Sequence, residues 1–384
     1  MEFGWPDELV AFRKRVREIL ERELPADWPE IRKKGKASPE QAAFGKKFAP
    51  VLAEEGLLVS NWPTEYGGNG GTPWEHFILG EELWSRGEPR GPQYMNVNWI
   101  GPALMFAASP EQKAKYLPPM TRGEVTWCQL FSEPSAGSDL AAMQTRAERQ
   151  PDGRYVVNGM KLWTSYALVA DYGFLLAKTG PARKDVSAFL VPMDTPGITV
   201  RPFNGLVEAG HCNEVYFDNV EIPAEARLGE EGKAWDIVRF ALGYERVGVQ
   251  RYQIAATELA VAMEELERRG QLEEPGVLAD AGMALASIEA CRLISYDVIS
   301  QRAGDAAPNE DASVARMAMA ECTRAFNAFV ARYLPEAISG QKIAGDYGIY
   351  KLYSFNISST LAAGAYEVQC DVVATRQLGL PRGG

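Results

Sequence analysis

The fold is decided by Trp127-Cys-Gln-Leu-Phe-Ser-Glu-Pro-Ser-Ala-Gly-Ser-Asp139, followed by Asn158-Gly-Met-Lys-Leu-Trp-Thr-Ser165. Either stretch alone is weak evidence. Gly137-Ser138 by itself indicates only a turn, because glycine adopts backbone conformations that other residues avoid. Trp163 by itself is most simply a core aromatic of a β-hairpin. The information lies in the occurrence of both stretches, in this order.

Short β-rich runs surround these two stretches between residues 123 and 228. Turns that contain Gly, Asp or Pro separate them, which is typical of short strands joined by tight connections. The runs are Arg154–Asn158, Tyr172–Ala177, Ser187–Pro192, Ile198–Arg201 and Glu214–Phe217. Their spacing predicts an antiparallel β-domain.

Helical patterns lie on both sides of this region. Near the N-terminus, Ser38 precedes Pro39 in the pattern of an N-cap followed by proline at the first helical position. Long helical patterns later in the chain are Val277–Arg302, Ala312–Leu334 and Thr360–Leu378. We therefore predict a helical domain over residues 1–122, a β-domain over 123–228 and a second helical domain over 229–384.

The composition excludes several classes of function. The formal net charge of −11 argues against binding to nucleic acids or to anionic membrane surfaces. The five cysteines have no CxxC spacing, and with only two histidines neither a zinc site nor a Ser-His-Asp hydrolase is indicated. We find no signal peptide and no apolar run of bilayer length, so we expect a cytoplasmic protein.

The two opening stretches resemble the flavin-binding segments of the acyl-CoA dehydrogenase family. Further landmarks of the family follow the chain almost from end to end: Asn61–Gly68, Gly101–Leu104, Glu111–Pro119, Asn213–Val220 and Val372–Arg382. The resemblance implies an α+β fold with an N-terminal helical domain, a middle antiparallel β-domain and a C-terminal four-helix-bundle domain.

The resemblance also implies an activity, the FAD-dependent α,β-dehydrogenation of an acyl-CoA thioester. In the family a carboxylate removes the α-proton while the β-hydrogen leaves as hydride to flavin N5, and an electron-transfer flavoprotein takes the electrons. This chemistry requires a positioned base and hydrogen-bond donors to the thioester oxygen. No metal is implied.

Seven residues match the family's flavin contacts. Ser132 and Ser165 are expected to hydrogen-bond the edge of the ring, and Trp163 is expected to lie against the ring face opposite the substrate. The full set is Phe131, Ser132, Gly137, Ser138, Trp163, Thr164 and Ser165.

The catalytic base has two possible places in the family. One precedes the last helix. When Glu367-Val-Gln369 is aligned with the family's C-terminal run, Ala363 occupies the position of the base, and Glu367 lies four residues beyond it. The other is an L-x-x-E-R run on a long helix, which reads Leu242-Gly-Tyr-Glu-Arg246 here and supplies Glu245. We therefore predict Glu245 as the base. Without the resemblance, Glu245 would be interpreted as a helix-surface carboxylate paired with an arginine.

Alanine at position 363 leaves one family role intact. The backbone N–H of Ala363 is still available to polarise the thioester, because that role needs no side chain. We therefore predict that Ala363 contributes its N–H to the site.

Two segments that one subunit of the family lends to its neighbour's FAD depart from the pattern. Arg268–Pro275 lacks the Phe-Gly that normally follows the arginine. In Lys342–Gly348, Lys342 occupies a glutamine position and Asp346 a glycine position, where a carboxylate is unfavourable beside a pyrophosphate. We infer a heteromer with a paralogous subunit, resembling the α2β2 acyl-CoA dehydrogenases of bacterial steroid side-chain breakdown. A homotetramer is the alternative.

Several functional alternatives stay open at this point. The substrate is expected to be a steroid side-chain CoA ester, with a short branched acyl-CoA as the alternative. An acyl-CoA oxidase, a flavin monooxygenase or a catalytically silent partner subunit are further alternatives. Apolar residues near Tyr94–Ile100 and Leu242–Tyr244 are expected to line the acyl pocket.

Overall fold

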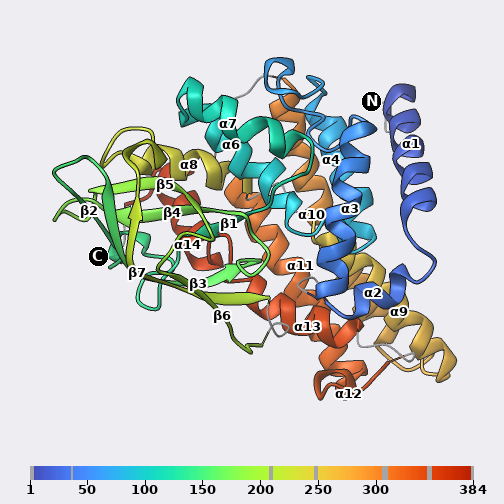
Figure 1. Ribbon diagram of the computed structural model, residues 1–384. Helices are drawn as coiled ribbons and strands as arrows, with labels where there is room; N and C mark the ends of the chain where they lie inside the picture. Colours follow the sequence, from blue (N-terminus) through green and yellow to red (C-terminus); the bar gives the residue numbers. More distant parts are fainter. Residues whose placement is uncertain are drawn as a thin grey trace. The chain divides into compact units, whose positions relative to one another are not determined.

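The computed structural model describes residues 4–35, 38–206, 211–245, 250–304, 310–343 and 348–381, without the side chains of Tyr244 and Glu245. Along the described residues helices come first, then the strands of one sheet, then helices again (Figure 1). This is the predicted helical, β, helical order. The chain divides into two compact units: Met1–Lys33, Thr72–Glu88 and Glu245–Gly384 form one, and Lys34–Gly71 and Pro89–Tyr244 form the other.

The second unit contains the sheet. Its strands run in the order β6-β7-β3-β2-β4-β5-β8, and β1 pairs with β4. Their bounds are β1 Trp127–Leu130, β2 Arg146–Arg149, β3 Tyr155–Ser165, β4 Tyr172–Lys178, β5 Val186–Pro192, β6 Ile198–Pro202, β7 Cys212–Ile222 and β8 Arg227–Leu228. Most pairings are antiparallel, as predicted, but β4 pairs in parallel with both β1 and β2, so the sheet is mixed.

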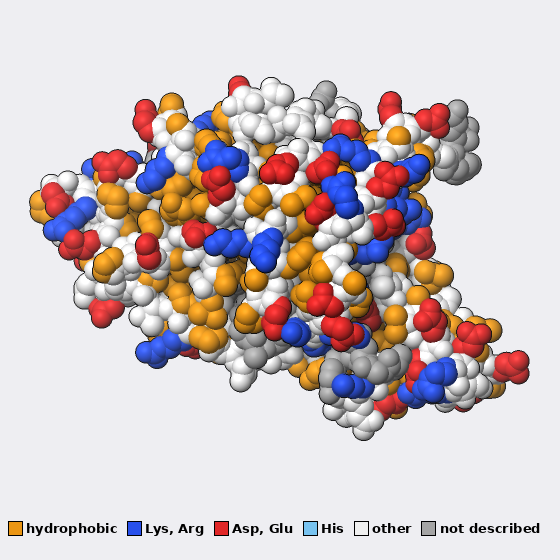
Figure 2. All heavy atoms as spheres, turned by 45° about the vertical axis from the view of Figure 1, so that its right-hand side comes forward, with side chains coloured by type: hydrophobic (Ala, Val, Ile, Leu, Met, Phe, Trp, Pro, Cys, Tyr) orange, Lys and Arg blue, Asp and Glu red, His pale blue; other side chains and the backbone are white. Residues whose placement is uncertain are grey.

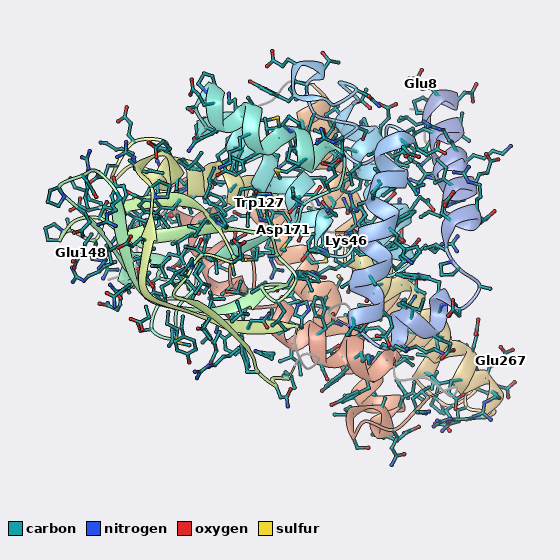
Figure 3. The ribbon with its side chains drawn as sticks, viewed as in Figure 1. Glu8, Lys46, Trp127, Glu148, Asp171 and Glu267 are labelled. Carbon is teal, nitrogen blue, oxygen red and sulfur yellow. The ribbon has the colours of Figure 1, made fainter. Side chains whose placement is uncertain are left out.

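Side-chain contacts fasten the start of β1 to β4, in the area labelled in Figure 3. The Asp171 carboxylate accepts hydrogen bonds from the Thr126 N–H at 2.7 Å and from the Thr126 hydroxyl at 2.9 Å. The rings of Trp127 and Tyr172 stack with centroids 4.8 Å apart, and Tyr116 packs edge-on against both. These contacts fix the position from which the loop after β1 departs.

Five helices complete this unit: α3 (Pro39–Glu54), α5 (Gln93–Met95), α6 (Gly101–Ala107), α7 (Pro110–Thr121) and α8 (Ala234–Glu245). Helix α3 begins after Ser38, as predicted. The Ser38 hydroxyl accepts a hydrogen bond from the Gln41 N–H ahead of α3, and Ser109 and Gln112 cap α7 reciprocally. A π-helical segment, Asn96–Ile100, links α5 to α6.

Two of the landmark segments meet in this unit. The Trp62 indole is fully buried, donates to the Val97 carbonyl at 3.0 Å, and covers Gly101 at the start of α6. A Cβ at Gly101 would lie 2.1 Å from Trp62 Cζ2, which is shorter than any permitted contact distance between two carbon atoms. Glycine is therefore required at position 101 by the tryptophan of the other landmark.

The first unit is helical. Its helices are α1 (Asp7–Glu23), α2 (Trp28–Lys33), α4 (Pro73–Ser85), α9 (Tyr252–Arg268), α10 (Val277–Ala303), α11 (Asp311–Tyr333), α12 (Pro335–Ile338), α13 (Gly348–Ser359) and α14 (Tyr366–Val372). Helices α9, α10, α11 and α13 pack on one another around a common apolar core. They form the four-helix bundle that the sequence predicts.

A buried carboxylate ties four helices of this unit together. Glu81 of α4 accepts hydrogen bonds from Arg13 of α1 at 2.7 Å, from Tyr252 and Gln253 of α9 at 2.9 and 3.1 Å, and from Tyr296 of α10 at 3.0 Å. A buried carboxylate with this many donors is satisfied both in charge and in hydrogen bonding. The network fixes where α9 begins.

The predicted helix over 360–378 is wrong in its first turn. Residues 360–365 form a turn, and α14 begins only at Tyr366. Ala363 has φ 58° and Gly364 has φ 97°, both in the left-handed region, which interrupts a right-handed helix. A side chain at Gly364 would also collide with the amide of Gln369, since its Cβ would lie 2.3 Å from Nε2.

Charged residues of both signs are interspersed over the face shown in Figure 2, with no separate basic area. In the part of the chain that the structure describes, every helix is too short or too polar to cross a membrane.

We predict that Gly101→Ala lowers the free energy of unfolding by about 1–3 kcal/mol, because the added methyl group overpacks the Trp62 ring. The matched control is Gly282→Ala in α10, where a Cβ meets no described atom within 4 Å. That change should stabilise by up to about 1 kcal/mol through helix propensity alone. Urea denaturation of both variants tests this, and wild-type stability of Gly101→Ala would contradict the packing argument.

Candidate functional site: a flavin cradle and a backbone turn

A buried ion pair joins the loop after β1 to strand β3. Lys161 Nζ of β3 lies 2.8 Å from Glu133 Oε1 and also donates to the Phe131 carbonyl at 3.0 Å. The side chains of Lys161 and Glu133 are 0% and 3% exposed. Leu162 of β3 adds a backbone hydrogen bond to the Ser132 carbonyl at 2.9 Å. The two opening stretches of the sequence are thus held together.

The Glu133 carboxylate has further donors. The backbone N–H groups of Gln144 and Thr145 both hydrogen-bond to it. Burial opposes ionisation of Glu133, but the Lys161 charge and these hydrogen bonds outweigh it and lower the pKa of Glu133. Burial lowers the pKa of Lys161 to about 8, against the pull of Glu133. Both groups are therefore charged at neutral pH.

Trp163 is exposed and conformationally strained. Its backbone has φ 61°, at a point where the register between β3 and β7 shifts, and its side chain is 58% exposed. Phe203 packs against it edge-on at 5.1 Å. A bulky residue in the left-handed region costs on the order of 1–2 kcal/mol, and such strain gathers at functional sites. The indole is therefore not a core aromatic of the hairpin.

The next two residues of β3 present hydroxyl groups. Thr164 is 1% exposed, and within the described residues its Oγ1 has no hydrogen-bond partner. Its carbonyl accepts from Asn213 Nδ2 at 2.9 Å, and Ser165 Oγ lies 3.5 Å from His211 Nε2. A buried hydroxyl without a partner costs about 1–3 kcal/mol, so a ligand that bonds to it gains this amount.

The loop residues present a mixture of buried and open positions. Phe131 is buried edge-on against Phe174 at 5.1 Å, and Ser132 is half-buried. Gly137 and Ser138 are exposed, and a Cβ at Gly137 would meet no described atom within 4 Å. The fold of this unit therefore does not itself require glycine at 137.

Ala363 lies in the helical unit, in the turn between α13 and α14. Its φ of 58° is unusual for alanine, and its N–H donates to no acceptor in the described part of the chain. The turn therefore holds a backbone donor without a partner among the described residues, at a half-buried position that a ligand can reach.

The two glutamates considered as base differ in what the structure shows. Glu245 is the last residue of α8, and its side chain lies outside the described atoms. The Glu367 side chain is 75% exposed and lies 4.0 Å from Arg324, whose guanidinium also stacks on Tyr366. Glu367 is thus a surface carboxylate near an arginine.

The arginines at the end of α9 are occupied within their own unit. Arg268 and Arg269 both hydrogen-bond to Glu265, at 2.7 and 2.6 Å, and Arg269 also pairs with Glu336. The hydrogen bonds from Arg268, followed by those from Arg269, lower the pKa of Glu265 to about 2, so Glu265 is charged at any physiological pH. Asp346 and the rest of the 344–347 segment lie outside the described residues.

Comparison with known proteins gives matches along the chain. Residues 6–124 match the acyl-CoA dehydrogenase N-terminal domain, and residues 128–220 match the acyl-CoA dehydrogenase middle domain. The acyl-CoA dehydrogenase IpdE1 of Mycolicibacterium smegmatis is 31% identical, over 98% of each chain. The acyl-CoA dehydrogenase FadE34 of Mycobacterium tuberculosis is 34% identical over 88% of this chain. The matched region covers 46% of FadE34, which is a longer protein.

Solved structures match over the full length. The Tcur3481-Tcur3483 steroid ACAD gives a TM-score of 0.87 at 29% identity, with 100% of both chains covered. The ChsE4-ChsE5 complex from Mycobacterium tuberculosis gives 0.85 at 26% identity, again with 100% of both covered. The chain belongs to the acyl-CoA dehydrogenase family, and the predicted fold class and FAD-dependent oxidoreductase activity are confirmed.

The described residues of the β-containing unit fit a flavin. An exposed indole face, an unpartnered buried hydroxyl on Thr164 and open space at Gly137 lie on two segments fixed to each other by the Lys161–Glu133 pair. Sequence reasoning missed Glu133 and Lys161. Both stand inside the quoted stretches, and a lysine within a strand that also carries buried apolar residues is the signal that identifies the pair.

We predict that Lys161→Met destabilises the protein by about 3–5 kcal/mol and lowers its flavin content, because Glu133 is left as a buried charge without a partner. Adding Glu133→Gln to the Lys161→Met variant should restore part of the lost stability and flavin content. The control is Arg154→Met, which removes an exposed pair with Glu221 beside the same sheet and should cost at most about 1 kcal/mol. Denaturation and flavin absorbance measure the effects. Equal behaviour of Lys161→Met and Arg154→Met would contradict the assignment.

Proposed function

We propose that this chain dehydrogenates the steroid side-chain ester of coenzyme A at its α,β-bond. The full-length likeness to a complex described as a steroid ACAD carries this choice of substrate. A short branched acyl-CoA is the alternative. Relative turnover of a steroid side-chain CoA ester and of isobutyryl-CoA separates the two, and a clear preference for isobutyryl-CoA would overturn the steroid proposal.

Glu245 is the proposed base for the α-proton. At the alternative place the residue is Ala363, whose side chain carries no proton acceptor. Glu367, the nearest carboxylate in sequence, is largely exposed and lies beside Arg324. Glu245 stands in the Leu-Gly-Tyr-Glu-Arg run that matches the second place used by the family, at the end of α8. A carboxylate base needs only to accept the proton as negative charge moves to the thioester oxygen.

The proposed donor to that oxygen is the N–H of Ala363. As the α-proton leaves, charge develops on the thioester oxygen, and a preorganised backbone donor stabilises it. The N–H has no acceptor among the described residues, which leaves it available for a ligand. Alanine serves this role as well as glutamate because the side chain does not take part.

The proposed flavin contacts are Ser132 and Ser165 at the ring edge, Trp163 on one ring face, and Phe131, Gly137, Ser138 and Thr164 around them. FAD held by these residues would supply the acceptor for the hydride that leaves the β-carbon. The Lys161–Glu133 pair keeps the loop and the strand that carry these contacts at a fixed separation.

We predict that Glu245→Gln keeps flavin and acyl-CoA binding and lowers turnover by at least about 100-fold, because the amide does not accept the proton. Glu367→Gln is the matched control and should be nearly neutral, since that side chain is 75% exposed. Steady-state rates with an artificial electron acceptor, together with acyl-CoA titration of the flavin spectrum, test both. Reversed effects would show that Glu367 is the base.

The chain is also proposed to work with a paralogous subunit. Arg268, at the place where the family contributes an arginine to the neighbouring FAD, shares the Glu265 carboxylate with Arg269, and the Phe-Gly that normally follows the arginine is missing. The full-length structural matches with Tcur3481-Tcur3483 and ChsE4-ChsE5 are both assemblies of two different proteins. A homotetramer is the alternative, and an electron-transfer flavoprotein is the proposed electron acceptor.

We predict little flavin in the chain purified alone, and about one flavin per heterodimer after co-expression with a neighbouring paralogue. The absorbance ratio of flavin to protein measures this. A ratio near one for the chain alone would support the homotetramer. Absence of flavin in both preparations would contradict the proposed activity and favour a silent partner subunit. Rapid reaction of the reduced flavin with oxygen would instead indicate an oxidase or a monooxygenase.

A further inference from the structure

A buried arginine contacts the turn that carries Ala363. Arg316 of α11 is 4% exposed, and its Nη2 donates to the carbonyl oxygens of Ser359 and, at 2.7 Å, of Ala362. These carbonyls stand where α13 ends, so they lack partners within the helix. A cation at a helix C-terminus also interacts favourably with the helix dipole.

The peptide bond transmits this contact to Ala363. The carbonyl of Ala362 and the N–H of Ala363 belong to one rigid plane and point in opposite directions. A guanidinium that fixes the oxygen on one side therefore fixes the direction of the N–H on the other. It also polarises the peptide, because a charge-assisted hydrogen bond to the oxygen strengthens the N–H as a donor.

The conformation of the turn needs such a restraint. Alanine at φ 58° is strained, and strain of this kind persists only where the surroundings impose it. Gly364 follows at φ 97° and packs against the buried Gln369 amide. Arg316 and Gln369 thus restrain the peptides on the two sides of Ala363.

We propose that Arg316 is a positioning residue for the dehydrogenation: it orients and polarises the 362–363 peptide so that the Ala363 N–H binds the thioester oxygen. The inference rests on the proposed role of Ala363. Arg316 acts on the reaction indirectly in this proposal, through its hydrogen bonds to the carbonyl oxygens of Ser359 and Ala362.

A pair of ligands isolates this role. Butyryl-CoA has the thioester oxygen and S-butyl-CoA, its thioether, lacks it. The Glu245→Gln enzyme, in which butyryl-CoA is not turned over, should bind butyryl-CoA more tightly than S-butyl-CoA, and the partner subunit is included if flavin retention needs it. Arg316→Met should remove about tenfold or more of that preference while the affinity for S-butyl-CoA stays the same. Arg316→Lys should restore part of it, and Arg332→Met, an exposed arginine of α11 paired with Asp280, should leave it unchanged.

A spectroscopic readout covers the case in which Arg316→Met fails to fold. The infrared band of crotonyl-CoA labelled with ¹³C at the carbonyl should shift to lower frequency when bound to the wild type, and less in Arg316→Lys. Equal losses of affinity for both butyryl ligands, or an unchanged carbonyl shift in Arg316→Lys, would overturn the inference while leaving the dehydrogenase activity in place. Absence of any dehydrogenation by the wild type would instead refute the proposed function.

Discussion

The proposed flavin site depends on the ion pair between Lys161 and Glu133. This pair joins the loop after β1 to strand β3, the two segments that carry the proposed flavin contacts. The loop after β1 and the middle of strand β3 are separate segments. A buried contact is needed to hold them at a fixed distance. The pair does so where neither charge reaches water, and the Phe131 carbonyl and two backbone N–H groups complete its hydrogen bonds. Burial makes the arrangement demanding, since either partner alone would be an isolated charge in a nonpolar interior.

Backbone conformation carries as much of the proposed chemistry as side chains do. Trp163 and Ala363, one in each compact unit, have φ angles of 61° and 58°, a region that residues with a Cβ rarely adopt. In each case the surrounding structure restrains the conformation. Trp163 lies where the register between β3 and β7 shifts, and the Arg316 guanidinium hydrogen-bonds to the peptide that precedes Ala363. Strain of this kind is paid by the packing of the surrounding fold, and it directs an indole face in one place and an N–H in the other.

Sequence patterns predicted the order of helices and strands and the N-cap at Ser38, because these depend on local periodicity and on short motifs. The flavin contacts named from the same motifs stay a prediction, although the structure holds the two segments that carry them together. The sequence patterns did not predict the turn at 360–365, where a helical pattern continues through Ala363 and only Gly364 signals a break. Nor did they identify Arg316, since the pattern of α11 gives no sign that one of its arginines is buried against carbonyls distant in sequence. Contacts of this kind arise only once the helices have packed.

The backbone N–H of Ala363 differs from a side-chain donor in the changes that can abolish it. A backbone amide has no pKa in the physiological range, so the proposed donor is indifferent to pH, and no single substitution other than proline removes it. The reactive chemistry of a side chain is therefore not needed at this position, and the residues that fit it are those that tolerate the left-handed region. The proposed donor thus depends on the shape of the turn and on residues distant in sequence, such as Arg316, rather than on a reactive side chain at position 363.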